Sequence, residues 1–271
     1  MTVDAFFELF LEELKQNNNL QSYYKFLNTK SGFYFRKAYF VQRLQYIYNN
    51  VQAGKKIWDC GCGYGTTGLF LAMNGIASSG TTIEFYFQQI AQRKEYWKQY
   101  GNVDLFKATH EDIFDNKPAD NSIDIIILQD TLHHLEPLQD ALKIMKDTLK
   151  SNGEIILIEE NGNNIIQNTK LYIRRGNKRI IKIWDEQLQK HVLLGNENIR
   201  SLANWKNEFS KQDMLIEDSK TQYLRYYLPF NFNSNNFDDK IKKEQEIWKH
   251  NNFLKEYFFF GLNFIVKKDR Y

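Results

Sequence analysis

The sequence contains few cysteines, few prolines and no long apolar run. Its two cysteines, Cys60 and Cys62, stand too close together to link distant segments by a disulfide, and so low a count is typical of a reducing compartment. No run approaches the roughly 18 apolar residues that a membrane-spanning helix needs. The opening segment MTVDAFFELFLEELK carries acids inside its apolar run, unlike a secretory signal. We therefore predict a cytoplasmic protein without a membrane span.

An excess of charge of one sign is also missing. The chain has 36 Lys and Arg residues against 33 Asp and Glu residues, a formal net charge of +3, and no basic block long enough to act as a nucleic-acid-binding arm. We therefore expect no nucleic-acid partner. The 271 residues, 42% of them hydrophobic, are enough for one large domain whose core needs neither disulfides nor metals.

From residue 55 onward, strand-like and helix-like segments alternate. The runs over residues 123–128 and 154–159 are almost continuously apolar and β-branched, which predicts strands buried on both faces. Between them, apolar side chains recur on one helical face from Leu138 to Leu149. Such alternation predicts an α/β fold with a parallel, doubly wound sheet. The same patterns predict further strands over residues 76–83, 103–108, 214–228 and 257–266, and further helices over 67–73, 86–100 and 238–250.

Two segments stand outside this alternation and predict a cap. Residues 1–50 have helical patterns, with one helix expected from Arg36 to Ile47, and residues 161–212 form a polar, helical or irregular insertion over the carboxyl edge of the sheet. The core then comprises residues 51–160, and residues 213–271 return to it as closing strands and a helix within a single domain. Aromatic side chains in and beside the cap, including Tyr23, Tyr24, Trp205 and Tyr223, are expected to face the acceptor and favour an apolar or aromatic small molecule as the partner.

The stretch DCGCGYG, residues 59–65, raises three interpretations of its function. A zinc site would need a second pair of ligands, which the neighbouring sequence lacks. A dinucleotide-binding turn would need glycine at position 66, where threonine stands, and Asp59 would repel a pyrophosphate. A cationic ligand fits both the glycines and the acid of this stretch, because glycines let the backbone approach the ligand and the acid attracts its positive charge. S-adenosylmethionine carries such a cation, while a purely structural turn stays open as the alternative.

The segment KIWDCGCGYGTTGLFLA resembles motif I of the class I S-adenosylmethionine-dependent methyltransferases. The resemblance continues through Ile83-Glu84, HEDIF, DNSIDIIILQDTLHHLEP and LKSNGEIILIEEN, over roughly residues 35 to 160. It implies a Rossmann-like, seven-stranded sheet with an antiparallel last strand. It also implies S-adenosylmethionine as the methyl donor and S-adenosylhomocysteine as the product. The cysteines are then incidental small residues, and no metal is expected.

The resemblance also assigns residues to the cofactor. The turn would hold the methionine part through Asp59, Gly61, Cys62, Gly63 and Gly65. Glu84, after the second strand, would accept hydrogen bonds from both ribose hydroxyls, although the family often has this acid at the position of Thr82. A solvated acid at the start of the next helix is the alternative for Glu84.

The adenine and the ends of the methionine have candidates of their own. Asp112 would accept from the exocyclic amine of adenine, with Glu111 as its rival, and Ile113 would pack on the ring. The backbone carbonyl of Gln129 would hold the methionine ammonium. Arg36 would pair with the methionine carboxylate, or stand in solvent on its helix.

His133 and His134 are the candidates for catalysis. They follow the fourth strand, at the edge where open α/β sheets bind ligands, and a histidine suits the removal of a proton from a hydroxyl or amine acceptor. In the family such a pair often has a structural or cofactor-shell role, and this alternative stays open.

These observations predict an enzyme that moves a methyl group to an oxygen, nitrogen or carbon atom of a small molecule. The alternative is a catalytically silent S-adenosylmethionine-binding protein with a regulatory or assembly role. A methylase of protein or RNA is a third possibility. The family's amino-methylating nucleic-acid enzymes carry an Asn/Asp-Pro-Pro-aromatic signature where this chain has QDTLHH, which argues against that subclass.

Overall fold

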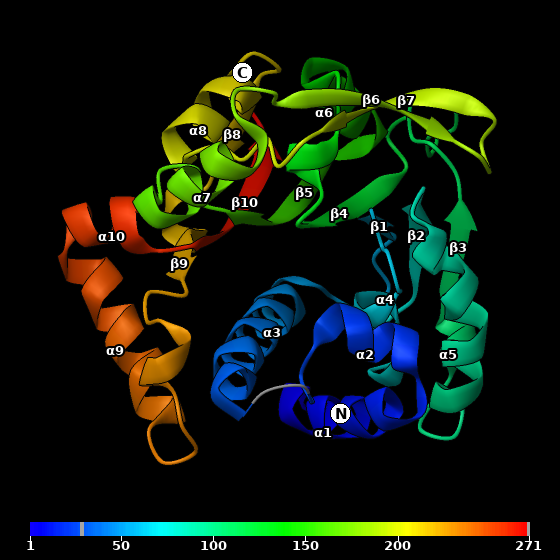
Figure 1. Cartoon of the computed structure of the whole chain (residues 1–271). Helices are drawn as coiled ribbons and strands as arrows, with labels where there is room; N and C mark the ends of the chain where they lie inside the picture. The colour runs from blue at the N-terminus through cyan, green and yellow to red at the C-terminus, as the bar shows by residue number, and fades with distance from the viewer. Residues whose placement is uncertain (28–29, 270–271) are drawn as a thin grey trace.

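The apolar runs of the sequence form the middle of one large sheet in the computed structural model, which describes residues 1–27 and 30–269 (Figure 1). The strand order is β3-β2-β1-β4-β5-β10-β8, and the first five strands along this order are mutually parallel. These strands are β1 (Ile57–Cys60), β2 (Ser78–Thr82), β3 (Phe106–His110), β4 (Ile123–Gln129) and β5 (Leu149–Glu160). The last strand, β10 (Gly261–Lys268), is antiparallel to β5, so the predicted fold class is confirmed.

The sheet has eight strands where seven were expected, because its seventh position, at the edge beyond β10, is divided. The segment expected to form one strand over residues 214–228 forms β8 (Met214–Ile216) and β9 (Gln222–Leu224), separated by a 3-10 turn at Asp218–Lys220. Both pieces pair antiparallel with β10, at its carboxyl and amino halves respectively. The turn breaks the ladder between them, and together they occupy the place of one strand.

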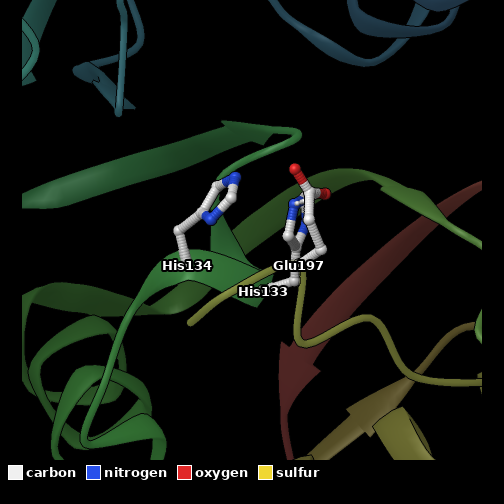
Figure 2. A group of neighbouring side chains, drawn as sticks. All are labelled: His133, His134 and Glu197. Carbon is white, nitrogen blue, oxygen red and sulfur yellow. Dashed lines mark ion pairs between the residues drawn. The ribbon is translucent and has the colours of Figure 1, made fainter. Parts of the chain in front are cut away.

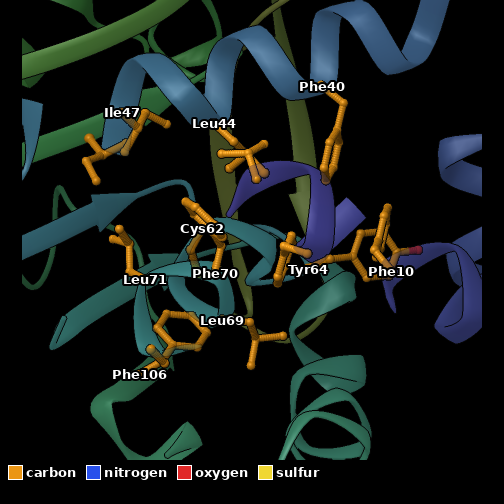
Figure 3. Close-up of a cluster of buried hydrophobic side chains, with 14 of the residues drawn as sticks. Phe10, Phe40, Leu44, Ile47, Cys62, Tyr64, Leu69, Phe70, Leu71 and Phe106 are labelled. Atoms are coloured by element: carbon orange, nitrogen blue, oxygen red, sulfur yellow. The ribbon is translucent and has the colours of Figure 1, made fainter. Parts of the chain in front are cut away.

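Successive residues of each central strand enter opposite faces of the sheet, because side chains alternate along a strand. One face buries Ile125, Ile127 and Ile156 against the helices α1 (Val3–Gln16), α2 (Asn18–Tyr24), α3 (Lys30–Asn50), α4 (Thr66–Met73) and α5 (Ile90–Trp97). Figure 3 shows part of this core, where Leu44, Ile47 and Phe70 lie close together. The other face buries Ile126 and Leu128 against the helices α6 (Leu138–Thr148) and α8 (Leu202–Ser210).

A buried ion pair holds α1 against α5 and the glycine turn. Arg93 donates from Nε and Nη2 to the two carboxylate oxygens of Glu13, each at 2.8 Å. Its Nη1 donates to the carbonyl of Tyr64 at 2.8 Å and to Oγ1 of Thr66 at 2.7 Å. The indole of Trp97 also donates to Glu13, at 2.8 Å. Because Arg93 and Glu13 are 1% and 3% exposed, this network fixes the amino-terminal helix inside the core.

Three predicted boundaries were wrong where aromatic or polar turns stand beside a strand or helix. The helix expected over residues 86–100 begins as a 3-10 turn at Phe85–Gln89 before α5. The strand expected from residue 103 begins at Phe106, after a 3-10 turn. The strand expected from residue 257 begins at Gly261, because Asn251 caps a short helix, α10 (Asn252–Phe258), that ends in the aromatic run.

The insertion contains a β-hairpin that the sequence did not predict. The hairpin is formed by the antiparallel strands β6 (Ile180–Asp185) and β7 (Lys190–Gly195). The helix α7 (Ile165–Arg175) precedes it in the insertion, and α8 follows it. Outside the insertion, the helix α9 (Phe237–His250) precedes α10. The side chain of Asp185 caps the hairpin turn by accepting from the backbone amides of Gln187 and Leu188. The hairpin lies across the edge of the sheet (Figure 1), where a bridge between Leu135 and Leu194 attaches it. None of the helices described above is long and apolar enough to cross a bilayer.

Candidate active site

A cleft of about 490 Å³ lies at the carboxyl ends of four neighbouring strands. Its floor is formed by the residues that directly follow β1, β2, β3 and β4, which are Gly61, Glu84, Glu111 and Asp130 with their neighbours. One wall comes from α2 and α3, and the opposite wall from β7 and the segment that follows it. Ligands of open α/β sheets bind at such strand ends, so the fold places the cleft where a ligand is expected.

The glycine turn is held in a conformation that glycine alone adopts easily. Gly61, Gly63 and Gly65 have φ values of 83°, 49° and 72°. The amides of Gly61 and Cys62 both donate to the carbonyl of Thr81, at 2.8 and 3.0 Å, which ties the turn to β2. A Cβ on Gly61 would stand 2.3 Å from Cγ2 of Thr131, whereas a Cβ on Gly63 would meet nothing within 4 Å. The turn is therefore closed beneath Gly61 and open at Gly63, where a ligand can approach the backbone.

This geometry predicts that Gly61→Ala weakens cofactor binding and stability together. Gly54 provides a matched control, because its φ is 81° but a Cβ there would meet nothing within 4 Å. Both alanine variants should lose about 1–2 kcal/mol of unfolding free energy to the left-handed backbone. Gly61→Ala should lose more, through the contact with Thr131, and should bind S-adenosylhomocysteine at least about tenfold more weakly than Gly54→Ala. Urea denaturation and titration calorimetry measure the two quantities, and equal affinities for the two variants would contradict the prediction.

Asp59 lies in β1, two residues before Gly61. It is a buried carboxylate with one unpaired oxygen. Its side chain is 2% exposed, and Oδ2 has no hydrogen-bond partner among the described residues. Burial raises the pKa of this carboxyl to about 7. An unpaired buried oxygen at a ligand cleft is suited to a cation, which would supply the missing partner. The residue thus fits the ammonium of S-adenosylmethionine, although Cys60 and Gly61, rather than Asp59 itself, line the cleft.

The candidates for ribose and adenine line the cleft side by side. Glu84 is exposed at the rim, and Thr82 before it is buried. Asp112 is buried, with Oδ1 accepting from the amide of Phe114 at 3.0 Å and Oδ2 paired to Nζ of Lys190 at 2.7 Å. Ile113 is buried beside it.

The rival of Asp112 is engaged at the surface. The carboxylate of Glu111 accepts from Oγ1 of Thr109 and from Nδ2 of Asn116, at 2.9 and 2.7 Å. Both acids line the cleft and both have engaged carboxylate oxygens, so the assignment of Asp112 to the adenine amine stays a prediction. Lys190 links Asp112 to the hairpin.

Of the two arginines of α3, it is Arg43 and not the expected Arg36 that lines the cleft. Arg36 is exposed and is not among the described residues that line the cleft, whereas Arg43 lines it. Two helical turns separate the two residues, about 10 Å along the axis, which places Arg36 beyond the cleft. Gln129 lines the cleft as expected, and its carbonyl accepts from Oγ1 of Thr131 at 2.8 Å.

A polar group that sequence reasoning missed connects α3 to the end of β4. The hydroxyl of Tyr39 donates to Oδ1 of Asp130 at 2.8 Å, and Nη1 of Arg43 donates to Oδ2 at 2.9 Å. Burial, followed by the charge of Asp130, raises the pKa of Tyr39, so this hydroxyl stays protonated. The spacing of Tyr39 and Arg43 places both on one helical face, but only the docking of α3 brings them to Asp130.

The two histidines occupy different environments. His133 is 2% exposed and does not line the cleft, whereas His134 does. Burial alone would lower the pKa of His133, but the charge of Glu159 and its hydrogen bond to the ring raise the pKa to about 9. Nδ1 of His134 lies 2.7 Å from the carbonyl of Gly195, which attaches the ring to the hairpin. Of the pair, His134 alone is placed to touch an acceptor in the cleft.

Fold and site together define an open α/β domain with a cleft at the carboxyl ends of its parallel strands. Residues 58–157 match the family described as the methyltransferase domain. A SAM-dependent methyltransferase from Archaeoglobus fulgidus has the same fold, with a TM-score of 0.54 and 17% identity over 84% of this chain and 92% of that one. A SAM-dependent methyltransferase from Methanosarcina mazei gives 0.55 and 15%, over 83% and 97%. Residues 58–157 thus match a methyltransferase domain, and the fold is that of solved SAM-dependent methyltransferases. Together these findings support a class I methyltransferase and imply S-adenosylmethionine as the cofactor.

Curated relatives are similar over part of their length. The ubiquinone biosynthesis O-methyltransferase of Pasteurella multocida (strain Pm70) is 30% identical over 122 residues, which are 42% of this chain and 50% of that protein. The hybrid PKS-NRPS synthetase thnA of Trichoderma harzianum is 29% identical over 164 residues, 58% of this chain and 4% of that protein. This chain thus spans half or less of the curated relatives that it matches.

Proposed function

We propose that the chain transfers the methyl group of S-adenosylmethionine to an oxygen, nitrogen or carbon atom of a small-molecule acceptor. The observation that carries this proposal is the cleft, which extends from the glycine turn to a polar end formed by Asp130, His134 and Glu197. Its volume of about 490 Å³ lies within the range of small-molecule sites. The cleft is thus large enough for a small-molecule ligand, and the hairpin covers one edge of the cleft.

The cofactor, when bound, supplies a methyl group on a sulfonium, which an acceptor atom displaces in line. The protein then has three tasks, which are to bind the donor, to align the acceptor and to exclude water. Asp59 and the glycine turn serve the first task. Arg43 and Asp130, which line the cleft, serve the second, because they pair with each other and Tyr39 holds Asp130 from behind. The hairpin, joined to the floor by Lys190 and Asp112, serves the third.

The lining favours an acceptor with an apolar or aromatic body. Tyr23 and Tyr24 of α2, expected to face the acceptor, do line the cleft, together with Leu135 and Leu194. Trp205 and Tyr223, expected there too, are buried in the core on the other face of the sheet. The relative named as an O-methyltransferase supports oxygen as the first acceptor atom to test.

Two measurements separate an active enzyme from a silent cofactor-binding protein. Titration calorimetry with S-adenosylmethionine and S-adenosylhomocysteine should show binding of both. A turnover assay with a library of phenols, aromatic acids and amines should then show S-adenosylhomocysteine release that depends on the acceptor. Tight cofactor binding without turnover on any acceptor would favour the silent protein. If neither compound bound, both the active enzyme and the silent cofactor-binding protein would be refuted.

A further inference from the structure

His133, His134 and Glu197 form a cluster of side chains (Figure 2). His134 and Glu197 line the polar end of the cleft, and His133 is buried beside them. The two histidines stand on the 3-10 turn after β4, and Glu197 stands on the segment that leaves β7. One ligand atom from each residue lies within 4.8 Å of the others, and Nε2 of His133 is 3.7 Å from Oε2 of Glu197. Residues far apart in the sequence thus present two imidazoles and one carboxylate to a common point.

The hydrogen bonds of the two rings engage the same nitrogen, Nδ1, so Nε2 is the nitrogen that a metal ion would bind, displacing any proton on it. Nδ1 of His134 faces the carbonyl of Gly195, which can only accept, so this nitrogen carries the proton and Nε2 keeps its lone pair. Nδ1 of His133 lies 2.5 Å from Oε2 of Glu159. Both rings therefore have the orientation of metal-bound histidines, whose second nitrogen donates to a carboxylate or a carbonyl.

The groups behind these ligands are themselves fixed. The second oxygen of Glu159 accepts from the amide of Leu132 at 2.8 Å, and Glu159 is fully buried. The backbone carbonyl of Glu197 accepts from Nη2 of Arg175 at 3.2 Å. The carboxylate of Glu197 is therefore carried on a restrained segment, and it lines the cleft together with His134.

We propose that His133, His134 and Glu197 bind one divalent transition-metal ion of the Zn²⁺ type. Two imidazoles and a carboxylate suit such an ion and do not suit Mg²⁺, which prefers oxygen ligands. Three protein ligands leave at least one coordination position open, as in catalytic zinc sites. That position faces the cleft, because His134 and Glu197 line it, and an oxygen atom of the acceptor can occupy it. This use of the ion rests on the proposed function, whereas binding of the ion does not.

The proposal departs from the expectation of a metal-free protein, which concerned the cysteines of the glycine turn. Both thiols are buried, and burial raises the pKa values of Cys60 and Cys62. A thiol must lose its proton to bind a metal, so this pair is a poor site. The sequence alone did not indicate the histidine group, since its third ligand comes from the insertion.

Titration calorimetry of the full chain without an affinity tag tests the site with Zn²⁺ and, separately, Mg²⁺. We expect one Zn²⁺ ion per chain and far weaker binding of Mg²⁺. His134→Ala and Glu197→Gln should each weaken Zn²⁺ binding by about 10–100-fold or more. His250→Ala and Glu186→Gln are matched controls on exposed residues, and both should bind Zn²⁺ as the parent chain does. His133 and Glu159 are left unchanged because their burial makes loss of folding the expected result of replacing them.

Absorption spectra of the Co²⁺-loaded chain identify the ligands directly. The proposed site gives d–d bands without thiolate charge transfer, and these bands should disappear in His134→Ala. Thiolate bands, or Zn²⁺ binding unchanged in both His134→Ala and Glu197→Gln, would overturn the proposal. Titration of the same proteins with S-adenosylhomocysteine separates the two claims. A chain that binds this product but no Zn²⁺ refutes the metal site alone, whereas failure to bind the product counts against the proposed function.

Discussion

Arg93→Met should lower the free energy of unfolding by about 3–5 kcal/mol, the largest loss of stability that we expect from one substitution. Arg93 and Glu13 are buried, and each carboxylate oxygen of Glu13 accepts from the guanidinium at 2.8 Å. Methionine would leave Glu13 as a buried carboxylate whose remaining partner is the indole of Trp97. It would also release the carbonyl of Tyr64, so affinity for S-adenosylhomocysteine should fall in the same variant. Urea denaturation measures the first effect and titration calorimetry the second.

The double variant Glu13→Leu/Arg93→Met tests the cause. It removes both charges, so most of the lost stability should return, apart from about 1 kcal/mol each for the indole of Trp97 and the carbonyl of Tyr64, which lose their hydrogen-bond partners. Lys15→Met is a matched control, since Lys15 pairs with Glu12 on the surface and should contribute about 0.2–1 kcal/mol. If Arg93→Met cost no more than Lys15→Met, the buried pair would not hold α1 in place.

The sequence predicted the elements whose side chains are buried in a regular pattern. The strands β1, β4 and β5 are apolar on both faces, and α6 has one apolar face, so each pattern follows from burial. The hairpin of β6 and β7 was missed because most residues of β6 are exposed or half-buried on both faces, which leaves no period-two pattern. The split into β8 and β9 was missed for a related reason, since pieces of three residues are too short to show one.

The residues of the candidate site also differ in how far the local sequence determines their positions. Residues at strand ends, such as Gly61, Glu84 and Asp112, could be placed from the sequence because the carboxyl ends of parallel strands meet at one edge. Arg43 and Glu197 could not, because their positions depend on how α3 and the hairpin dock onto that edge. Cofactor assignments therefore came from local motifs, whereas the acceptor end became visible only in three dimensions.

Asp59→Asn should weaken binding of S-adenosylmethionine by about 10–100-fold, because a cation loses its charged partner in a buried site. The same change should stabilise the protein without cofactor at neutral pH and above. The carboxyl has a pKa of about 7 in the folded chain and 3.8 as its ordinary value. Between these values the folded state binds the proton more tightly, so the stability of the parent chain falls as pH rises through this window. Asparagine stays neutral, so its advantage in melting temperature should be absent near pH 4, grow as pH rises, and reach its full size above about pH 7.

The affinity of the parent chain for S-adenosylmethionine should rise with pH, whereas the stability of the parent chain falls. A bound ammonium favours the ionised form of Asp59, so binding to the parent chain releases a proton and strengthens from about pH 5.5 to pH 7. That range lies below the pKa of the ligand's amino group, about 7.7–8.0 for an ordinary α-amine. Affinity of the Asp59→Asn variant should not change over the same range. Calorimetry in two buffers of different ionisation heat measures both affinity and proton release. If the variant bound S-adenosylmethionine as tightly as the parent chain, Asp59 would not be the partner of the cation, even if the variant melted at a higher temperature.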